Sequence, residues 1–316
     1  MTTFNVDSLL RTSYPRPHLR KLILSYGVDW ILVGVFSLGF WLFDYIPPFH
    51  RKFSLTDKTI SYPFALHGTV PNWQLFVFSF LVPLVILSAV ALAIRRSPYD
   101  CHSALLGLCF CMSLTLLVTH ILKTTIGRLR PDFIDRCQPT VTQDAPLGLS
   151  GSEICAQADS KILLDGMKSF PSGHTSLSFA GLTFLSLYLA GKLHLFDERG
   201  HTYKSFICVA PMIGAALIGV SRICDYRHHW QDVVVGALIG MAAAYYSYRQ
   251  YYPHLGSPRC DKPFPPRIPN PFRDKYREDT DRLLRTASPL PEEDPDEILV
   301  DDGHFSSPSP SPFVTL

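Results

Sequence analysis

The sequence predicts an all-α membrane protein, a bundle of six transmembrane helices. Of its 316 residues, 47% are hydrophobic and only 18% are charged. The apolar residues gather in long runs that carry almost no charge, and a run of roughly 18 or more such residues is typical of a helix that spans a bilayer. The six predicted spans cover residues 28–45, 73–94, 104–122, 177–190, 206–220 and 233–246.

The first three spans are strongly apolar. The first carries Asp29 and Asp44 only near its ends, and Arg95 and Arg96 close the second. The last three are shorter and rich in Gly, Ala and Ser, which let helices pack closely inside a bundle. Aromatic residues near span ends favour the lipid headgroup level. They are Trp30, Trp41, Trp73, Tyr245 and Tyr246. Several such runs in one chain argue against the alternative, a soluble helical protein.

Three regions follow from this pattern. Residues 1–26 form a basic N-terminal segment without the cleavage site of a signal peptide, so the first span is interpreted as a retained anchor. Residues 27–252 form the six-span domain. Residues 253–316 are rich in Pro, Ser and acidic residues and bury too little apolar surface to fold alone, which predicts a disordered tail.

An even number of spans places both termini on one side of the membrane. Basic residues are nearly balanced between the two sides, but discounting cations that a functional site would need tilts the termini toward the cytoplasm. The loop over residues 131–170 then faces a lumen or the cell exterior. Cys137 and Cys155 lie in this loop and form a disulfide if that compartment is oxidising, which the sequence leaves open.

Several function classes receive no support. The formal net charge of +2 and the absence of a basic stripe argue against nucleic acid. The eight cysteines show no zinc-binding spacing. A transporter needs an ionisable residue deep within a span or broken helices, whereas Asp29 and Asp44 lie near span ends. Oligomeric state is not indicated.

Three polar clusters lie at span ends that the topology brings to one membrane face. In the first, Lys123 and Arg130 are seven residues apart, so a helix ending at Pro131 would present both from one side. Two cations there suit an anionic headgroup. Ordinary snorkelling of basic residues is the alternative explanation.

The second cluster, Pro171-Ser172-Gly173-His174, is a turn signal before the fourth span. A helix N-terminus offers free N–H groups to phosphate, Gly173 permits close approach, and Ser172 adds a hydroxyl. His174 can then give a proton to a leaving oxygen. A plain helix cap with an incidental histidine is the alternative.

The third cluster joins the last two spans. His228 and Asp232 are four residues apart and share a helix face, so the carboxylate can orient the imidazole and leave one ring nitrogen free to attack. Arg222 supplies a planar fork for phosphate oxygens. His229 is the rival nucleophile, because it also lies within helical reach of Asp232.

Together the clusters read Lys-x6-Arg-Pro, Pro-Ser-Gly-His and Ser-Arg-x5-His-x3-Asp, in order from Lys123 to Asp232. This three-part pattern resembles the signature of the type 2 phosphatidic acid phosphatase (PAP2) superfamily, whose fold is shared with haloperoxidases. The stretches 170–193 and 220–240 look most like fungal diacylglycerol pyrophosphate phosphatase and animal phospholipid phosphatases.

The resemblance implies a magnesium-independent lipid phosphate phosphohydrolase in the endomembranes or plasma membrane, with no cofactor or metal and with the lipid bilayer as its partner. His228 would form a phosphohistidine, His174 would protonate the departing oxygen, and Asp232 would orient His228. The implied phosphate-binding residues are Lys123, Arg130, Ser172, Gly173 and Arg222.

Plausible substrates are phosphatidate, lysophosphatidate and diacylglycerol pyrophosphate. An isoprenyl diphosphate phosphatase would use the same chemistry on another tail, and the sequence does not separate the two. A vanadate-dependent haloperoxidase would be soluble, against six predicted spans. A non-catalytic membrane scaffold is disfavoured, because His174, His228 and Asp232 are all present.

Overall fold

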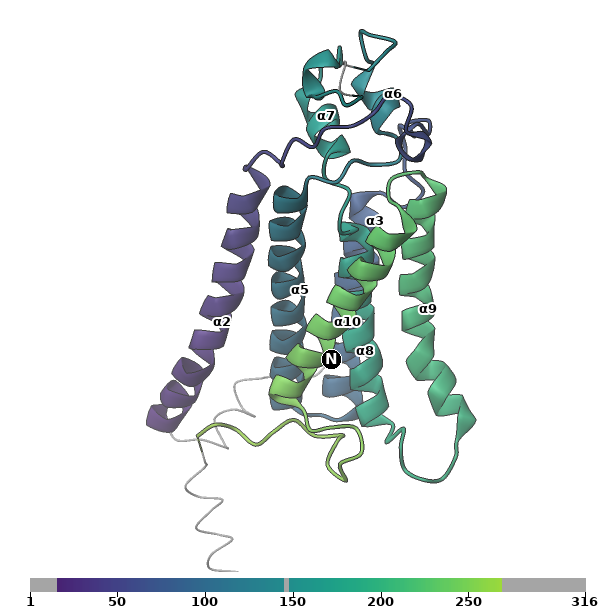
Figure 1. Ribbon diagram of the computed structural model, residues 1–316. Coiled ribbons are helices and arrows are strands. Elements are labelled where there is room, and N and C mark those ends of the chain that lie inside the picture. Colours follow the sequence, from purple (N-terminus) through teal and green to yellow (C-terminus); the bar gives the residue numbers. More distant parts are fainter. Residues whose placement is uncertain (1–15, 145–147, 269–316) are drawn as a thin grey trace, which may run out of the picture. The chain divides into compact units, whose positions relative to one another are not determined.

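The computed structural model describes residues 16–144 and 148–268, which fold into a bundle of long helices (Figure 1). Within these residues there is no strand, only two isolated bridges. The long helical segments are α2 (Arg16–Asp44), a continuous stretch over residues 72–94, α5 (Pro98–Ile126), α8 (Gly173–Lys192), α9 (Thr202–Cys224) and α10 (Trp230–Tyr251). The all-α prediction is therefore confirmed.

The remaining elements are short. The 72–94 stretch is built from α3 (Asn72–Phe76), η2 (Val77–Leu81), α4 (Val82–Ala89) and η3 (Val90–Ile94), with η2 and η3 wound as π-helix. The connections carry η1 (Lys58–Ile60), α6 (Phe133–Cys137), η4 (Ser152–Ile154) and α7 (Ser160–Gly166).

Four long segments of the described chain are apolar and long enough to cross a membrane: residues 20–44 of α2, the 72–94 stretch, α5 and α9. Large apolar side chains on them lie exposed, including Ile31, Val85 and Leu217. A surface of this kind is typical of contact with lipid rather than water. α8 and α10 lie where the fourth and sixth spans were predicted but are less apolar, so the six-span count stays a prediction.

α8 is the central helix of the bundle. It packs against α5, α9, α10 and the 72–94 stretch. Buried small and hydroxyl-bearing residues, such as Ser176 and Ala180, make these contacts possible. A Cβ added at Gly240 of α10 would lie 2.3 Å from the carbonyl oxygen of Ser176, so only glycine permits this approach. Because α8 is enclosed by other helices, it needs less apolar surface than a helix that faces lipid.

Helix bounds differ from the predicted spans mainly at their ends. α2 begins at Arg16, within the segment assigned to the N-terminus, and α5 extends to both sides of 104–122. Hydropathy marks only the apolar stretch of a helix, whereas the helix itself continues through flanking polar residues. Residues 1–15 and 269–316, which include most of the predicted tail, lie outside the described residues.

The first residues assigned to the tail, 253–268, pack onto one end of the bundle. Asp261 forms an ion pair with Arg95, and Arg267 forms one with Asp29. The Phe264 amide donates to the carbonyl oxygen of Tyr251 over 2.8 Å. The helical unit therefore extends through Ile268 rather than ending at residue 252.

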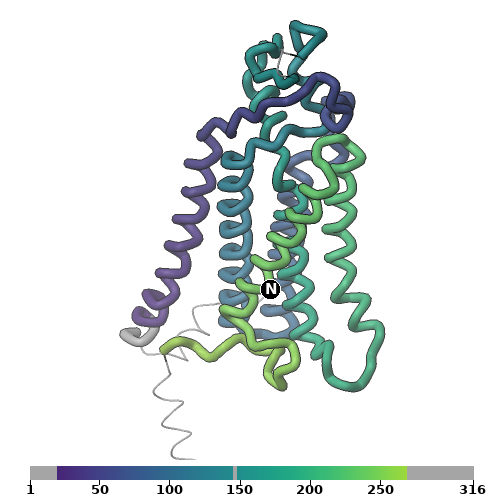
Figure 2. The backbone as a smooth tube through the Cα atoms, in the orientation of Figure 1, coloured from purple at the N-terminus to yellow at the C-terminus, as the bar shows by residue number. Residues whose placement is uncertain are grey.

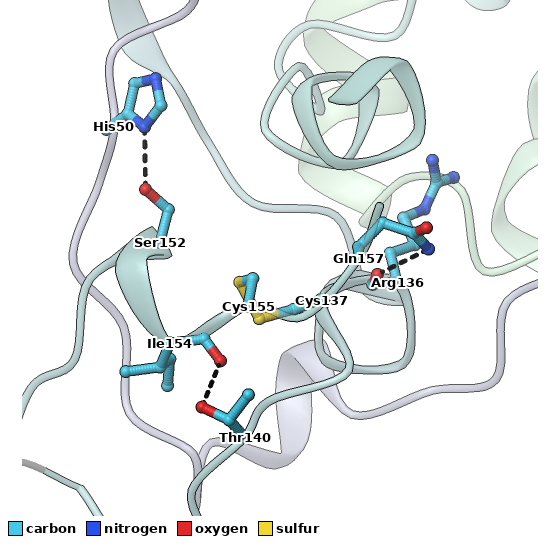
Figure 3. Close-up of a disulfide and its surroundings, with 8 residues drawn as sticks. All are labelled: His50, Arg136, Cys137, Thr140, Ser152, Ile154, Cys155 and Gln157. Carbon is cyan, nitrogen blue, oxygen red and sulfur yellow. Dashed lines mark hydrogen bonds between the residues drawn. A yellow bond between two sulfur atoms is a disulfide. The ribbon is translucent and has the colours of Figure 1, made fainter. Parts of the chain in front are cut away.

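The loops over residues 46–71 and 127–172 gather at the other end (Figure 2). There the Phe49 amide donates to the carbonyl oxygen of Thr124, over 2.9 Å. Cys137, the last residue of α6, is disulfide-bonded to Cys155 (Figure 3). This pairing, which the sequence left open, fastens together the loop that carries α6 and α7.

Candidate active site

All three sequence clusters lie at the end of the bundle that carries these loops. Backbone and side-chain hydrogen bonds tie the loops to the α9–α10 connection and to the first turn of α10. Among the pairs that they join are Ser172 and Asp232, Thr69 and Asp225, Arg227 and Ala65, and His229 and Thr59. Segments far apart in the sequence therefore form one polar region, as the convergence of the clusters predicted.

In the first cluster, the helix ends earlier than the sequence predicted. α5 ends at Gly127, which has a left-handed φ of +57° and whose Cβ, if present, would lie 1.9 Å from the carbonyl oxygen of Phe49. Pro131 therefore does not end the helix, and Arg130 lies in the connection beyond it. Lys123 remains on α5 and donates to the carbonyl oxygen of Lys168 over 2.7 Å.

In the second cluster, Ser172 is the residue that precedes α8. Its side chain is fully buried, and its hydroxyl accepts a hydrogen bond from Thr175 over 2.9 Å. Gly173 and His174 begin the helix. Nε2 of His174 lies 3.1 Å from the carbonyl oxygen of Val70, so this contact needs a proton on Nε2. The loop before α3 therefore orients the imidazole.

The third cluster is buried at the join of α9 and α10. His228 is only 4% exposed, and its Nδ1 has no hydrogen-bond partner within the described chain. Nδ1 lies 3.9 Å from Oδ2 of Asp232, longer than a hydrogen bond. Catalytic hydrogen bonds are often long in an unliganded protein and shorten when substrate binds. Arg222 pairs with Asp225 over 2.8 Å.

Asp232 is held by groups from two other segments. Its carboxylate is fully buried and accepts hydrogen bonds from Arg128 over 2.7 Å and from the Ser169 hydroxyl over 2.6 Å. The backbone amide of His229 also donates to Oδ2, over 3.1 Å. These bonds fix the carboxylate beside His228 before any ligand arrives.

Two cavities meet at this site. A polar cavity of about 580 Å³ lies under the loop over residues 66–72 and also has Arg222 and Arg227 in its wall. A groove of about 620 Å³ runs between α2, the 72–94 stretch, α5 and α8. Apolar side chains such as Val33, Met112 and Leu116 line part of it. Both cavities are lined by Asn72, Arg130, Asp165, His174 and His228.

The cavities distinguish the two adjacent histidines. His228 lines both, whereas His229 lines neither. His229 instead caps α10, with Nδ1 3.4 Å from Asp232 and Nε2 3.3 Å from the carbonyl oxygen of Thr59. Of the other predicted residues, Lys123 and Gly173 line the groove, Arg222 lines the polar cavity, and Ser172 lies behind the wall.

Burial and nearby positive charge keep His228 neutral. Burial is the largest cause that lowers the pKa of His228 to about 3. The positive charges of Arg130 and Lys123 lower this pKa further, whereas Asp232 raises it. Burial raises the pKa of Asp165, but Arg130 and Arg136 outweigh it and hold that pKa well below its usual range. At neutral pH the imidazole therefore has a free electron pair, and Asp165 is ionised.

Sequence patterns missed three residues of the site. Arg128 stands two residues from Arg130, but only the turn at Gly127 decides which arginine reaches Asp232. Asp165 of α7 pairs with Arg130 over 2.7 Å, and Arg227 lines the polar cavity. Asp165 lies on the short helix α7, in a segment that carries no recognisable motif, so no sequence signal marked it.

Comparison with known proteins identifies the family of the chain. Residues 104–255 match the model of the PAP2 superfamily. The chain is 41% identical over 258 residues to lipid phosphate phosphatase 2 of Arabidopsis thaliana, covering 76% of this chain and 84% of that protein. The chain belongs to the PAP2 superfamily.

Two further relatives extend the comparison. Diacylglycerol pyrophosphate phosphatase 1 of Saccharomyces cerevisiae is 37% identical over 251 residues, covering 77% of this chain and 87% of that protein. A crystal structure of a transmembrane PAP2 type phosphatidylglycerolphosphate phosphatase from Bacillus subtilis aligns with a TM-score of 0.35 and 20% identity, over 73% of this chain and 94% of that one. With its apolar helices, this PAP2 chain is an integral membrane protein.

Proposed function

We propose that this PAP2 protein is a lipid phosphate phosphatase that acts on phosphatidate, lysophosphatidate or diacylglycerol pyrophosphate. The observation that carries the proposal is the position of His228 and His174 at the junction of two unlike cavities. The polar cavity suits phosphate and water, and the groove suits a hydrocarbon tail. A substrate that joins a phosphate to an apolar chain fits both.

The proposed reaction has two steps. Burial is the largest cause that lowers the pKa of His174 to about 4, so His174 takes up a proton from water when the anionic phosphate binds. Nε2 of His228 attacks phosphorus, an N–P bond forms, and the P–O bond to the lipid breaks while His174 gives that proton to the departing oxygen. A water molecule then attacks phosphorus, His174 takes the water proton, and the N–P bond breaks to release phosphate. Asp232 stabilises the imidazole of His228 while it carries positive charge.

Cations would stabilise the charge on the phosphoryl oxygens. We assign this role to Lys123, Arg130 and Arg222, with the N–H group of Gly173. The N–H group of Ser172 already donates to the carbonyl oxygen of Asp232 over 3.0 Å, so Ser172 supports the turn that places Gly173. Lys123 and Arg130 line the groove and Arg222 lines the polar cavity, so the three flank the nucleophile from two sides. Within the described residues, no three His, Cys, Asp or Glu side chains gather in a way that could hold a metal ion.

The activity should therefore survive a chelator. Purified protein in detergent and EDTA is expected to release phosphate from phosphatidate and diacylglycerol pyrophosphate, because arginine and lysine supply the charge that a metal would otherwise supply. Phosphate release would be measured on both lipids and on farnesyl diphosphate. Activity that EDTA abolishes and magnesium restores would contradict this mechanism.

The same assay separates the alternatives. A preference for farnesyl diphosphate would favour an isoprenyl diphosphate phosphatase, whose substrate has a tail that also suits the apolar groove. Folded protein with no activity on any of the three would favour a membrane scaffold.

We further propose that the termini are cytoplasmic and that the active site faces a lumen or the cell exterior. The Cys137–Cys155 disulfide supports this orientation, because disulfides persist in oxidising compartments. A tag placed after Leu316 is expected to be digested by protease added to sealed cytoplasm-side-out vesicles. A tag protected until the vesicles are opened would reverse the topology.

A further inference from the structure

His120 is a polar residue inside a membrane-spanning helix that the proposed reaction does not use. It lies on α5, one turn from Lys123, and lines the groove. Its Nδ1 is buried and has no hydrogen-bond partner within the described chain. A buried polar group without a partner is unfavourable, and an ionisable residue at membrane depth more often serves function than packing.

The surroundings of His120 hold its ring at the groove wall. Oδ1 of Asp44, the last residue of α2, lies 3.5 Å from Nδ1. The ring of Phe40 packs edge-on at 4.4 Å between centroids. Lys168 lies 3.7 Å from the same Asp44 oxygen. These contacts orient the imidazole, which can still form a hydrogen bond with a ligand in the groove.

The position of His120 along the groove matches one part of a lipid. On α5 the groove wall passes from Lys123 at the phosphate end through His120 to Leu116 and Met112 at the apolar end. His120 is three residues from Lys123, a rise of about 4.5 Å along the helix. In a glycerolipid phosphate, the oxygens of the glycerol linkage lie between the phosphate and the hydrocarbon chains.

We propose that His120, whose Nδ1 faces the carboxylate of Asp44, binds an oxygen of this glycerol linkage. This inference rests on the proposed phosphatase function and names the substrate class that the site selects. An imidazole can donate to an ester carbonyl or accept from a hydroxyl. An isoprenyl chain has neither group at this depth, so it offers the imidazole no hydrogen bond. His120 therefore favours glycerolipid phosphates over isoprenyl phosphates.

The test compares two monophosphates, phosphatidate and farnesyl phosphate, in the same detergent. For the unaltered protein and for His120→Leu, kcat/KM would be measured on both. The ratio of the two values is expected to fall about tenfold in His120→Leu, because a single hydrogen bond is lost for phosphatidate only. His120→Gln keeps a donor and an acceptor and is expected to retain most of the preference.

A matched control is available on the same helix. His102 of α5 packs against Tyr26 and accepts a hydrogen bond from Trp30 over 3.3 Å, away from the groove. His102→Leu is expected to leave the substrate ratio unchanged. An unchanged ratio in folded His120→Leu, or equal losses on both substrates, would overturn the inference while leaving the phosphatase function intact. Failure of the unaltered protein on both substrates would remove the proposed function, and this inference with it.

Discussion

Replacing His228 with alanine is expected to lower phosphate release by at least about 10⁴-fold, because removal of a covalent nucleophile leaves only binding and charge stabilisation. His228 lines both cavities and is kept neutral, so its imidazole is available to attack phosphorus. The measurement is kcat/KM on phosphatidate. Rapid quenching in alkali, in which an N–P bond survives, after reaction with phosphorus-labelled substrate should also detect a phosphorylated protein only when His228 is present.

The adjacent histidine provides the control. His229→Ala removes the cap of α10 and a contact to Asp232, at a cost of about 1 kcal/mol in stability. Because His229 lines neither cavity, its loss should reduce activity less than about tenfold. If His229→Ala abolished activity and His228→Ala did not, the assignment of the nucleophile would be reversed.

The nearness of several site residues could be predicted from sequence, because these residues keep fixed spacings on short segments. His228 and Asp232 lie within one turn of the start of α10, and Gly173 and His174 begin α8. Local backbone geometry fixes such neighbours, so the spacing alone indicates that they can act together.

Other parts of the site depend on how distant segments pack, which spacing does not encode. Asp165 reaches Arg130 from α7, and Val70 reaches His174 from the loop before α3. Hydropathy likewise identifies the helices that face lipid but describes α8 less well, because its neighbours in the bundle cover it. Residues 253–268 belong in sequence to the predicted disordered tail, but ion pairs to distant helices hold them against the bundle.

Asp232→Asn is expected to lower kcat by about 10³- to 10⁴-fold without a matching rise in KM, because the carboxylate stabilises positive charge that appears on His228 only during reaction. The asparagine NH2 group would also replace one of the two oxygens that now accept hydrogen bonds from Arg128 and Ser169. Arg128→Met should produce part of the same loss, since it frees the carboxylate to move.

Two further variants distinguish the loss of kcat in Asp232→Asn from a loss caused by lower stability of the fold. Asp132 is also fully buried and accepts two hydrogen bonds from Arg136, but among the described residues its ion pair is with Arg136, whereas Asp232 lies beside His228. Asp132→Asn should therefore lower thermal stability, by about 3–5 kcal/mol for a broken buried pair, while the folded fraction keeps its kcat. In the Asp232→Asn background, Arg128→Met should add little, because both changes remove one interaction. Additive losses would mean that Arg128 acts on the phosphate itself rather than through Asp232.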